Sequence, residues 1–469
     1  MASINPKTNG TNGVAPAPLD ASCLKITRAE TLKPVPTPGT YTFGDVKTDH
    51  MLIMTYHPKT GWSAPEIKPY GPIPIDPSSN CLQYATNVFE GMKAVLDPQG
   101  RPRMFRPQQN MQRLVTSAAR MALPPFDADA LLTCITKLVA IEARWIPALP
   151  DHSLYIRPTM IGTKPSIKVG ASDQAVLYTI VTPVGPYFTA QSTPGVDASV
   201  RGGTTGAVSL LAVSSHVRSW PGGTGGFKLG LNYSPGFVPQ QMAAGLGYDQ
   251  VLWLLEINGE TRVTEAGAMN FFAVRRDEEG VTIVTPPLDG TILPGITRDS
   301  AIVLLRAHAS NPTQKILDIA PSPSLLQPTD MKIVVEERPL TLTELSTWAE
   351  EGKLVECFGT GTAVLVVGIE RIGEVLTEAG VVTDEEAVAD VVKDQAGGEG
   401  IEHVGVNGKG AGENENGKVE GKAAPKIRDI TMSAGRGLGP VGRALWDKLL
   451  ALKEGREEWG EPAWNVLCE

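Results

Sequence analysis

The sequence predicts a globular protein of mixed helices and strands, with room for more than one domain. Its 469 residues suffice for two or three ordinary domains, and 42% of them are hydrophobic, enough to fill the cores of such domains. Segments with the alternating pattern of strands and segments with the apolar spacing of helices both occur along the chain. We therefore expect a soluble chain with a mixed fold.

Charge and cysteine usage limit the possible partners. The chain has 42 basic and 51 acidic residues, a net charge of −9 without a basic stripe, so we expect small molecules or another subunit as partners and no nucleic acid. Its five cysteines follow no metal-binding or Cys-x-x-Cys spacing, so we expect reduced thiols and no metal site. No apolar run approaches the roughly 18 residues of a membrane span. These observations predict no membrane partner and a cytoplasmic location, with the mitochondrion as the alternative.

The first half of the chain begins with a polar segment. Residues 1–20 contain no aromatic residue and no arginine, which argues against a secretory signal and an Arg-rich transit peptide, so we expect a disordered tail there. Beyond it, apolar spacing predicts several elements in order. They are a strand at 50–57, a Pro-rich connection at 64–77, a helix through 110–122, a second helix capped by Asp127 or Asp129, and strands at 153–162 and 176–188.

The second half contains further strand-like runs at 248–255, 269–276 and 280–287. A capping box with a hydrophobic staple predicts a helix from 341 to about 353. The four residues that form this signal are Leu340, Thr341, Glu344 and Leu345.

Glycine-rich segments indicate connections. We expect an interdomain connection at 201–206, where glycine and threonine dominate. From 394 to 425, nine of 32 residues are glycine and none is leucine or aromatic, so this segment buries too little to order itself and we expect a disordered insertion. A closing helix near 440–455 follows it and presents leucines on one face.

The most informative stretch is SWPGGTGGFKLGLNYSP, residues 219–235, in which four glycines precede Lys228 and an Asn-Tyr pair follows it. The glycines lack a Cβ, so a flat ligand or another backbone segment can approach closely. A phosphate-binding P-loop needs glycine directly before the lysine and Ser or Thr after it, and Phe227 and Leu229 occupy those places. On this stretch alone, a reactive lysine and an ordinary solvated lysine are both open.

Two arginines stand out by their position in predicted elements. In the strand SLYIRPTMIG, a period of two places Tyr155 and Arg157 on one face, and an inward-facing arginine is costly unless it meets an anion. Arg113 falls off the apolar stripe of its helix, so a solvated side chain and a phosphate ligand are alternatives.

The blocks of the chain, taken together, resemble the branched-chain aminotransferases, the fold-type-IV enzymes that use pyridoxal 5'-phosphate. The resemblance covers about residues 19–382 and returns weakly at 426–469. Beside the lysine stretch it includes LDASCLKIT, TDHMLIM, PYGPIPIDP, YATNVFEGMKAV, FRPQQNMQRL, YIRPTMIGT, VTEAGAMNFF, LPGITR and FGTGTA.

This resemblance implies two α/β domains with the cofactor between them. It divides the chain into a tail at 1–20, a small domain at 21–200, a connection at 201–212, a large domain at 213–393 that carries the lysine, the insertion at 394–425, and a C-terminal helix of the large domain at 426–469. It also implies a homodimer that moves the amino group of leucine, isoleucine or valine to 2-oxoglutarate, so that amino acids and 2-oxo acids are its partners.

The resemblance further implies roles for the cofactor-binding residues. Lys228 would hold pyridoxal 5'-phosphate covalently and move protons during catalysis, as a desolvated lysine can. Glu265 would keep the pyridine nitrogen protonated, and Tyr233 would contact the ring hydroxyl. The cofactor phosphate would be bound by Arg113, by the backbone of Gly295, Ile296 and Thr297 at a helix N-terminus, and by Thr362.

It implies roles for substrate-binding residues as well. Tyr84 and Phe89 would line the pocket for the substrate side chain. Tyr155, with the backbone of Thr362 and Ala363, would hold the α-carboxylate, and Arg157 would bind the γ-carboxylate of glutamate.

Three departures from the family pattern affect the expected substrate range. Ala268 stands where relatives usually have threonine, and Leu231 and Ser234 replace small residues. A methylene or a hydroxyl near a pocket changes discrimination by about 1–3 kcal/mol. These departures leave the reaction type intact. The alternatives are a related transaminase for D-amino acids, amines or specialised amino acids, an aminodeoxychorismate-lyase-like enzyme and a non-catalytic paralogue. The blocks FEGMKA and YIRPT argue against the related enzymes, and the joint presence of Lys228, Glu265, Tyr233 and Arg113 argues against the paralogue.

Overall fold

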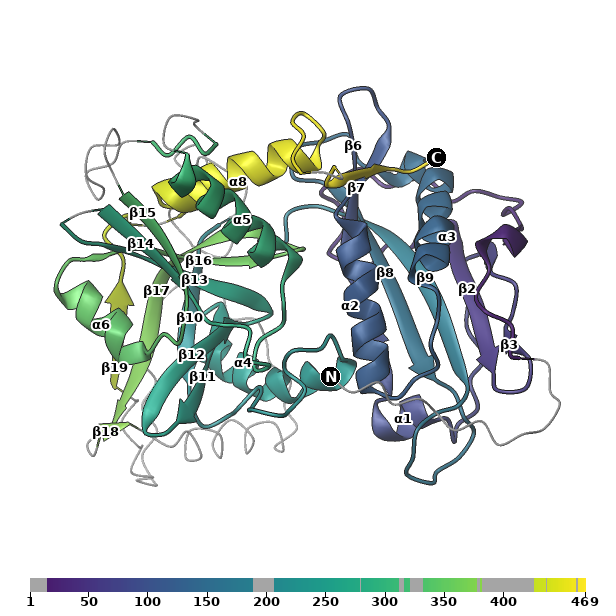
Figure 1. The fold of residues 1–469 in the computed structure, drawn as a ribbon, viewed down its shortest axis with the longest axis horizontal. Coiled ribbons are helices and arrows are strands. Elements are labelled where there is room, and N and C mark those ends of the chain that lie inside the picture. Colours follow the sequence, from purple (N-terminus) through teal and green to yellow (C-terminus); the bar gives the residue numbers. More distant parts are fainter. Residues whose placement is uncertain are drawn as a thin grey trace, which may run out of the picture. The chain divides into compact units, whose positions relative to one another are not determined.

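The computed structural model describes residues 15–188, 206–278, 280–311, 316–320, 332–377, 380–381, 426–435, 437–460 and 463–469. Their contacts divide the chain into two compact units (Figure 1). The first unit contains the described residues up to Tyr187, the segment Phe227–Tyr233, and the chain from Asp447 on. The second contains the described residues of Phe188–Gly226 and Ser234–Trp446. The segment with Lys228 thus makes its contacts in the first unit, whereas the family resemblance implied that it belongs to the large domain.

The insertion expected at 394–425 lies outside the described residues.

The first unit contains a ten-stranded sheet with the order β1-β4-β2-β9-β8-β6-β7-β20, in which β3 pairs with β2 and β5 pairs with β8. Its pairs are antiparallel except for β1 and β4. The strands are β1 (Lys25–Ile26), β2 (His50–His57), β3 (Gly61–Trp62), β4 (Glu66–Pro69), β5 (Asn87–Phe89), β6 (Met92–Leu96), β7 (Pro102–Phe105), β8 (Ser153–Gly162), β9 (Ala175–Val184) and β20 (Asn465–Leu467).

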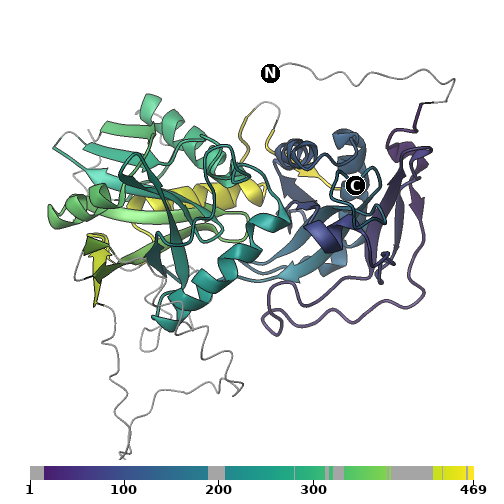
Figure 2. The ribbon, with the colours of Figure 1, turned by 90° about the horizontal axis from the view of Figure 1, so that it is seen from below.

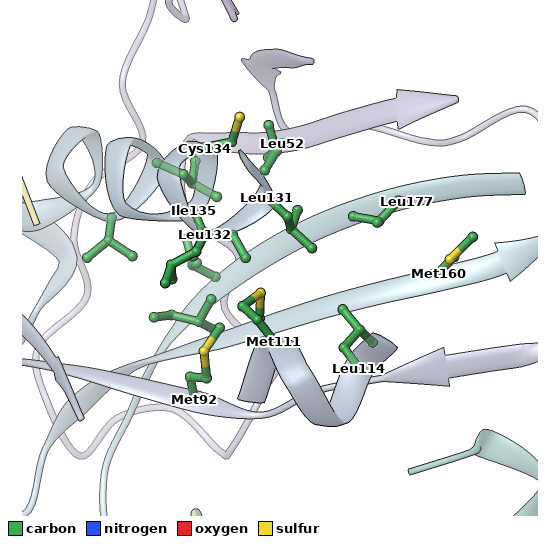
Figure 3. Close-up of a cluster of buried hydrophobic side chains, with 14 of the residues drawn as sticks. Leu52, Met92, Met111, Leu114, Leu131, Leu132, Cys134, Ile135, Met160 and Leu177 are labelled. Atoms are coloured by element: carbon green, nitrogen blue, oxygen red, sulfur yellow. The ribbon is translucent and has the colours of Figure 1, made fainter. Parts of the chain in front are cut away.

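Two helices, α2 (Pro107–Arg120) and α3 (Ala128–Ile141), cover one face of this sheet, and Figure 2 shows them, in blue, on one side of the strands. Of the two predicted caps for α3, Asp127 is the one that accepts a hydrogen bond, from the Ala130 N–H at 2.8 Å. Leucines of α3 and of the strands form the core between them (Figure 3). Burial of each such side chain contributes about 1.5–3 kcal/mol. A short helix, α1 (Asn80–Tyr84), precedes β5.

The second unit has its own ten-stranded sheet, with the order β12-β11-β10-β17-β16-β13-β14-β15 and with β18 and β19 paired to β17. The strands are β10 (Val208–Val213), β11 (Gln250–Ile257), β12 (Glu260–Ala266), β13 (Met269–Arg276), β14 (Gly280–Thr285), β15 (Lys332–Glu337), β16 (Leu354–Gly361), β17 (Leu365–Thr377), β18 (Gly380–Val381) and β19 (Lys426–Thr431). Its helices are α4 (Phe237–Gly245), α5 (Ile296–Ser310), α6 (Leu342–Glu350) and the start of α8 (Pro440–Lys453). No helix among the described residues is long and apolar enough to cross a membrane.

Two tight turns place β12 in the second sheet. Asn258 and Gly259 join β11 to β12. Their φ angles are 55° and 78°, and a type I′ hairpin turn requires a positive φ at both of its central residues. Gly267, with φ of 55°, and Ala268 then join β12 to β13. The strand β12 was missed in the sequence, although the Asn-Gly pair is a strong hairpin signal.

The expected tail at 1–20 contains ordered residues at its described end. The Ala17 carbonyl accepts a hydrogen bond from the Trp62 N–H at 2.9 Å, and Leu19 is buried in the first core. Apolar residues this close to the first strand can pack against the core. The polar composition of residues 1–20, taken as a whole, did not indicate this burial. Residues 1–14 lie outside the described part.

Two other expectations need correction. Residues 208–212, assigned to the connection at 201–212, belong to β10, whose six residues are all buried between β11 and β17. Both of these pairings are parallel, and buried parallel strands lose the alternation that marks strands in a sequence. The C-terminal segment 426–469 contains β19 and β20 in addition to the expected helix, and from Asp447 on it belongs to the first unit.

The predicted capping box is confirmed. The Thr341 Oγ1 accepts from the Glu344 N–H at 3.1 Å, and a Glu344 carboxylate oxygen accepts from the Thr341 N–H at 3.0 Å. Leu340 and Leu345, the predicted staple, are both buried in the second core. The helix α6 ends at Glu350, slightly before the expected 353.

A buried carboxylate joins α8 to the second sheet. Glu356 of β16 accepts from the Val441 N–H at 2.8 Å and the Gly442 N–H at 3.1 Å, at the first turn of the helix. Burial raises the pKa of Glu356 to about 7, and the backbone donors only partly oppose this. A Cβ at Gly439 would lie 2.6 Å from the carboxylate, so this approach requires glycine.

We predict that Glu356 makes the protein less stable as the pH rises. Its pKa is about 7 in the folded protein and 4.5 ordinarily, so the folded state binds the proton more tightly. The stabilisation is complete below pH 4.5 and is lost as the pH rises through 7. Thermal melting of wild type and Glu356→Gln across about pH 5 to 7.5 should show a decline in wild type that the variant lacks. Parallel curves would contradict this assignment.

Candidate functional site

The backbone of Lys228 is held from both sides within the first unit. Its N–H donates to the Ser117 Oγ at 2.9 Å, and its carbonyl accepts from the Phe89 N–H at 3.2 Å. Ser117 lies on α2 and Phe89 ends β5, while the next residue, Leu229, is fully buried in the first core. The position of Lys228 is therefore set by its backbone, independently of what its side chain binds.

The side chain of Lys228 lies among aromatic groups. Its Nζ donates to the Tyr233 hydroxyl at 3.1 Å and lies 5.0 Å from the centre of the Phe89 ring. A short helical turn, Gly230–Asn232, brings Tyr233 back to the lysine, and the Asn232 side chain fixes this turn by donating to the Phe227 carbonyl at 2.9 Å. The amine is thus half-buried, with a phenol oxygen beside it and an aromatic ring beneath it.

Tyr155 and Arg157 share a face of β8, as strand alternation predicts. The Arg157 Nη2 donates to the Tyr155 hydroxyl at 3.1 Å, and the guanidinium lies 4.6 Å from the Phe89 ring centre. The Arg157 Nε is buried and has no hydrogen-bond partner among the described residues. The structure therefore gathers Lys228, Tyr233 and this pair around Phe89.

Arg113 is buried, so the solvated alternative is wrong. Its Nε and Nη2 donate to the two carboxylate oxygens of Glu90 at 2.7 and 2.9 Å. Burial tends to lower the arginine's pKa, but the charge of Glu90 outweighs it and the pKa is raised. Arg113 lies one helical turn before Ser117, the residue that holds the Lys228 backbone. Glu90 was not identified from the sequence, although a lone Glu within an apolar run is a usable signal.

Tyr84 lies elsewhere. It ends α1, is 36% exposed, and its hydroxyl donates to the Ile167 carbonyl. The structure does not bring it into the group around Phe89, so its predicted place in a substrate pocket stays a prediction.

In the second unit, Glu265 of β12 is buried and carries a set of partners. Its carboxylate forms an ion pair with Arg218 at 2.5 Å and accepts from the Asn270 Nδ2 and the Leu293 N–H, both at 3.3 Å. Arg218 is itself only 6% exposed. The sequence pattern did not identify Arg218, which lies just before the glycine stretch, and no local signal links it to Glu265.

The helix predicted to open at Gly295, Ile296 and Thr297 is confirmed as α5, with Gly295 at its N-cap. Gly295 lies against the Asn270 side chain, where a Cβ has no room. The first N–H groups of such a helix attract anions. Thr362 and Ala363 lie in the turn between β16 and β17, and Ala268 is exposed in the turn before β13.

An orphaned hydroxyl supports the fit of a polar ligand in the second unit. The Thr360 Oγ1 is buried without a hydrogen-bond partner in the described part of the chain. Thr360 is paired with Asn270 in the register of β13 and β16, so it shares a face with the residue that contacts both Glu265 and Gly295. A carboxylate, a helix N-terminus and a hydroxyl suit a ligand with a basic ring nitrogen and a phosphate. Within the described ranges, no group of three or more His, Cys, Asp or Glu side chains could hold a metal ion.

Comparison with known proteins gives a consistent result. Residues 87–320 match the family model of amino-transferase class IV. The mitochondrial branched-chain-amino-acid aminotransferase of Schizosaccharomyces pombe is 42% identical over 364 residues, 77% of this chain and 77% of the relative. The cytosolic one of Rattus norvegicus is 40% identical over 353 residues, 75% of this chain and 77% of the relative.

Solved structures share the fold. The branched-chain aminotransferase of Thermoproteus uzoniensis, crystallised with norvaline, has a TM-score of 0.57 and 19% identity and covers 90% of this chain and 100% of its own. A second branched-chain amino acid aminotransferase, from T.th., is complexed with N-(5'-phosphopyridoxyl)-L-glutamate. It has a TM-score of 0.55 and 19% identity, with 89% of this chain and 98% of its own covered.

We predict that Arg218 and Glu265 are strongly coupled in stability. Arg218→Met leaves a buried carboxylate without its cation, which should cost about 3–5 kcal/mol of unfolding free energy. The double variant Arg218→Met/Glu265→Gln removes both charges and should recover at least about 2 kcal/mol of that loss. Urea unfolding of wild type, both single variants and the double variant measures this coupling. Additive losses would show that the two side chains do not interact.

Proposed function

The chain belongs to the branched-chain aminotransferases, within the class IV aminotransferases, and from that premise we propose that it moves the amino group of leucine, isoleucine or valine to 2-oxoglutarate. The observation that carries the proposal is the half-buried amine of Lys228, held on the Tyr233 hydroxyl over the Phe89 ring. Such an amine is positioned for covalent catalysis, whereas a purely structural lysine needs none of these contacts.

The cofactor is pyridoxal 5'-phosphate, which class IV aminotransferases use. When bound, it supplies an electron sink for the electron pair that remains at the substrate Cα once the proton has left. We assign its covalent attachment to Lys228 and its ring-nitrogen partner to Glu265, the buried carboxylate of β12. Its phosphate would be held by Arg113, the N-terminus of α5 and Thr362, and its ring hydroxyl by Tyr233.

Lys228 would also act as the acid–base group. Once the substrate amine has released it from the cofactor, its Nζ would take the proton from the substrate Cα and deliver it to the C4′ position of the cofactor. This transfer requires an amine that moves while its backbone stays fixed. Two hydrogen bonds of the lysine backbone provide that fixed point, one donated to the Ser117 Oγ and one accepted from the Phe89 N–H. The Tyr233 hydroxyl accepts a hydrogen bond from the Lys228 amine. This bond restricts the positions that the amine occupies between proton transfers.

The substrate would be recognised by the group around Phe89. The aromatic ring offers apolar surface to a branched side chain, while Tyr155 offers a hydroxyl to the α-carboxylate. Arg157, with its unsatisfied Nε, is suited to the γ-carboxylate of glutamate. The roles of Tyr84, Ala268 and Ala363 in this recognition stay predictions.

The homodimer and the cytoplasmic location also stay proposals. Named relatives include both cytosolic and mitochondrial enzymes, so the similarity does not choose between these compartments.

Two measurements separate this function from its alternatives. A panel of L-amino acids, D-amino acids and amines tested with 2-oxoglutarate should give the fastest turnover with the branched L-amino acids. A related transaminase would instead prefer another donor. Visible absorbance of the purified protein distinguishes either kind of transaminase from a non-catalytic paralogue. The transaminases hold the cofactor covalently and absorb visible light, whereas the paralogue does not.

We predict that Arg157→Met separates the two half-reactions. A buried γ-carboxylate without its guanidinium is costly, while a branched side chain needs only apolar surface. Single-turnover conversion with glutamate should slow by about 100-fold or more, and conversion with leucine should stay within about tenfold of wild type. Because both substrates share one enzyme preparation, leucine serves as the control for folding. Equal losses on both would mean that Arg157 maintains the architecture or binds the α-carboxylate.

A further inference from the structure

A fully buried carboxylate, that of Glu90, lies next to the group around Phe89 without a role in the proposed chemistry. It follows Phe89 in the loop between β5 and β6. One oxygen accepts from the Arg113 Nε at 2.7 Å. The other accepts from the Arg113 Nη2 at 2.9 Å, the Asn110 Nδ2 at 2.7 Å and the Gly91 N–H at 3.2 Å. Four donors on one buried carboxylate form a satisfied polar cluster, since an unpaired charge there would be very costly.

The loop around Glu90 is fixed by its backbone. The Glu90 N–H donates to the Pro158 carbonyl at 2.8 Å, which ties the loop to β8 beside Arg157. On one side Phe89 contacts Lys228, and on the other Gly91 lies against the Tyr155 hydroxyl, where a Cβ has no room. Glu90 therefore has little freedom to move, and its carboxylate is a rigid reference for whatever it binds.

Glu90 imposes this rigidity on Arg113. Two parallel N–H···O bonds define the plane of a guanidinium as well as its position. Asn110 lies three residues before Arg113 on the same face of α2 and donates to the same carboxylate, so it limits the movement of Glu90 from the helix side. The orientation of the arginine is thus set by the protein before any ligand is present.

We propose that Glu90 is a positioning residue that pre-orients Arg113 for the cofactor phosphate. This rests on the proposed function, in which Arg113 binds that phosphate. A purely electrostatic view gives the opposite expectation, because a negative carboxylate beside Arg113 weakens its attraction for a phosphate dianion. Removal of the Glu90 charge should weaken phosphate binding if the orientation of Arg113 matters more, and should strengthen it if electrostatic attraction matters more. The direction of the change therefore distinguishes the two views.

The test uses Glu90→Gln in the full-length protein stripped of cofactor. Glutamine has one acceptor oxygen for the four donors, and its NH₂ group faces a donor of Arg113 or Asn110, so the guanidinium loses its fixed orientation. Quenching of tryptophan fluorescence measures Kd for pyridoxal 5'-phosphate and for pyridoxal, which lacks the phosphate. The Kd of pyridoxal divided by the Kd of the phosphorylated form reports phosphate recognition alone. We expect this ratio to fall at least tenfold in Glu90→Gln. An unchanged ratio, or tighter binding of the phosphorylated form, would overturn the proposal.

Glu142→Gln is the matched control. Glu142 is a buried carboxylate of the same unit that accepts from the Asp49 N–H at 2.8 Å and pairs with His50 at 2.5 Å. Its loss should lower stability without changing the ratio. If Glu90→Gln does not fold, Asn110→Ala removes one partner of the same carboxylate, and there a fall of about threefold is expected while an unchanged ratio overturns the proposal.

Arg113→Met distinguishes failure of this inference from failure of the proposed function. It should lower the same ratio at least as much as Glu90→Gln does. If it does not, Arg113 does not bind the phosphate, and that part of the proposed function falls together with the inference. If Arg113→Met lowers the ratio and Glu90→Gln leaves it unchanged, only the positioning role of Glu90 is wrong.

Discussion

The two hydrogen bonds that hold the Lys228 backbone, to the Ser117 Oγ and from the Phe89 N–H, are the constraint on which the first unit's site depends. The first bond ties the lysine to α2, and the second ties it to β5, which pairs with β8. Because strand side chains alternate between faces, a slip of one residue in that pairing would turn Tyr155 and Arg157 away from Phe89. The register of the β5–β8 pairing thus determines that Tyr155 and Arg157 lie on the same side as Phe89.

Buried charge is the second common feature of the two units. The first contains Arg113 with Glu90, and the second contains Arg218 with Glu265. Buried ion pairs contribute little net stability, because their desolvation offsets their attraction. Their physical value lies in fixed orientation, which a site for a charged and flat ligand requires. A similar argument applies to Glu356, where the carboxylate fixes the start of α8 at the cost of a raised pKa.

Local patterns predicted a large part of the fold. The strands at 50–57, 153–162 and 269–276 have the predicted bounds, as alternation and bounding residues determine such elements. The family, the α/β fold and the cofactor that the motifs implied are confirmed. Missed elements, such as β10 and β20, depend on pairing with distant strands, which local patterns do not encode.

For the site, too, local patterns predicted some features, while features that depend on contacts between distant residues were missed. Alternation along one strand correctly placed Tyr155 beside Arg157, and the helix that the resemblance implied at Gly295 is confirmed as α5. The partners Glu90 and Arg218 were missed because each meets its counterion only through tertiary packing. The helical pattern also left open a solvated Arg113, since periodicity records apolar burial and cannot register a buried charge with a distant acceptor.

The central claim, that Lys228 binds the cofactor covalently, can be tested by treating the holoenzyme with borohydride, which makes the bond between a lysine amine and the cofactor aldehyde permanent. Peptide mapping should then find the added group on Lys228. Lys93 is the natural competitor, because burial and the neighbouring Lys453 lower its pKa to about 7, despite the opposing charge of Asp151. An added group on Lys93, or no modified peptide at all, would contradict the account.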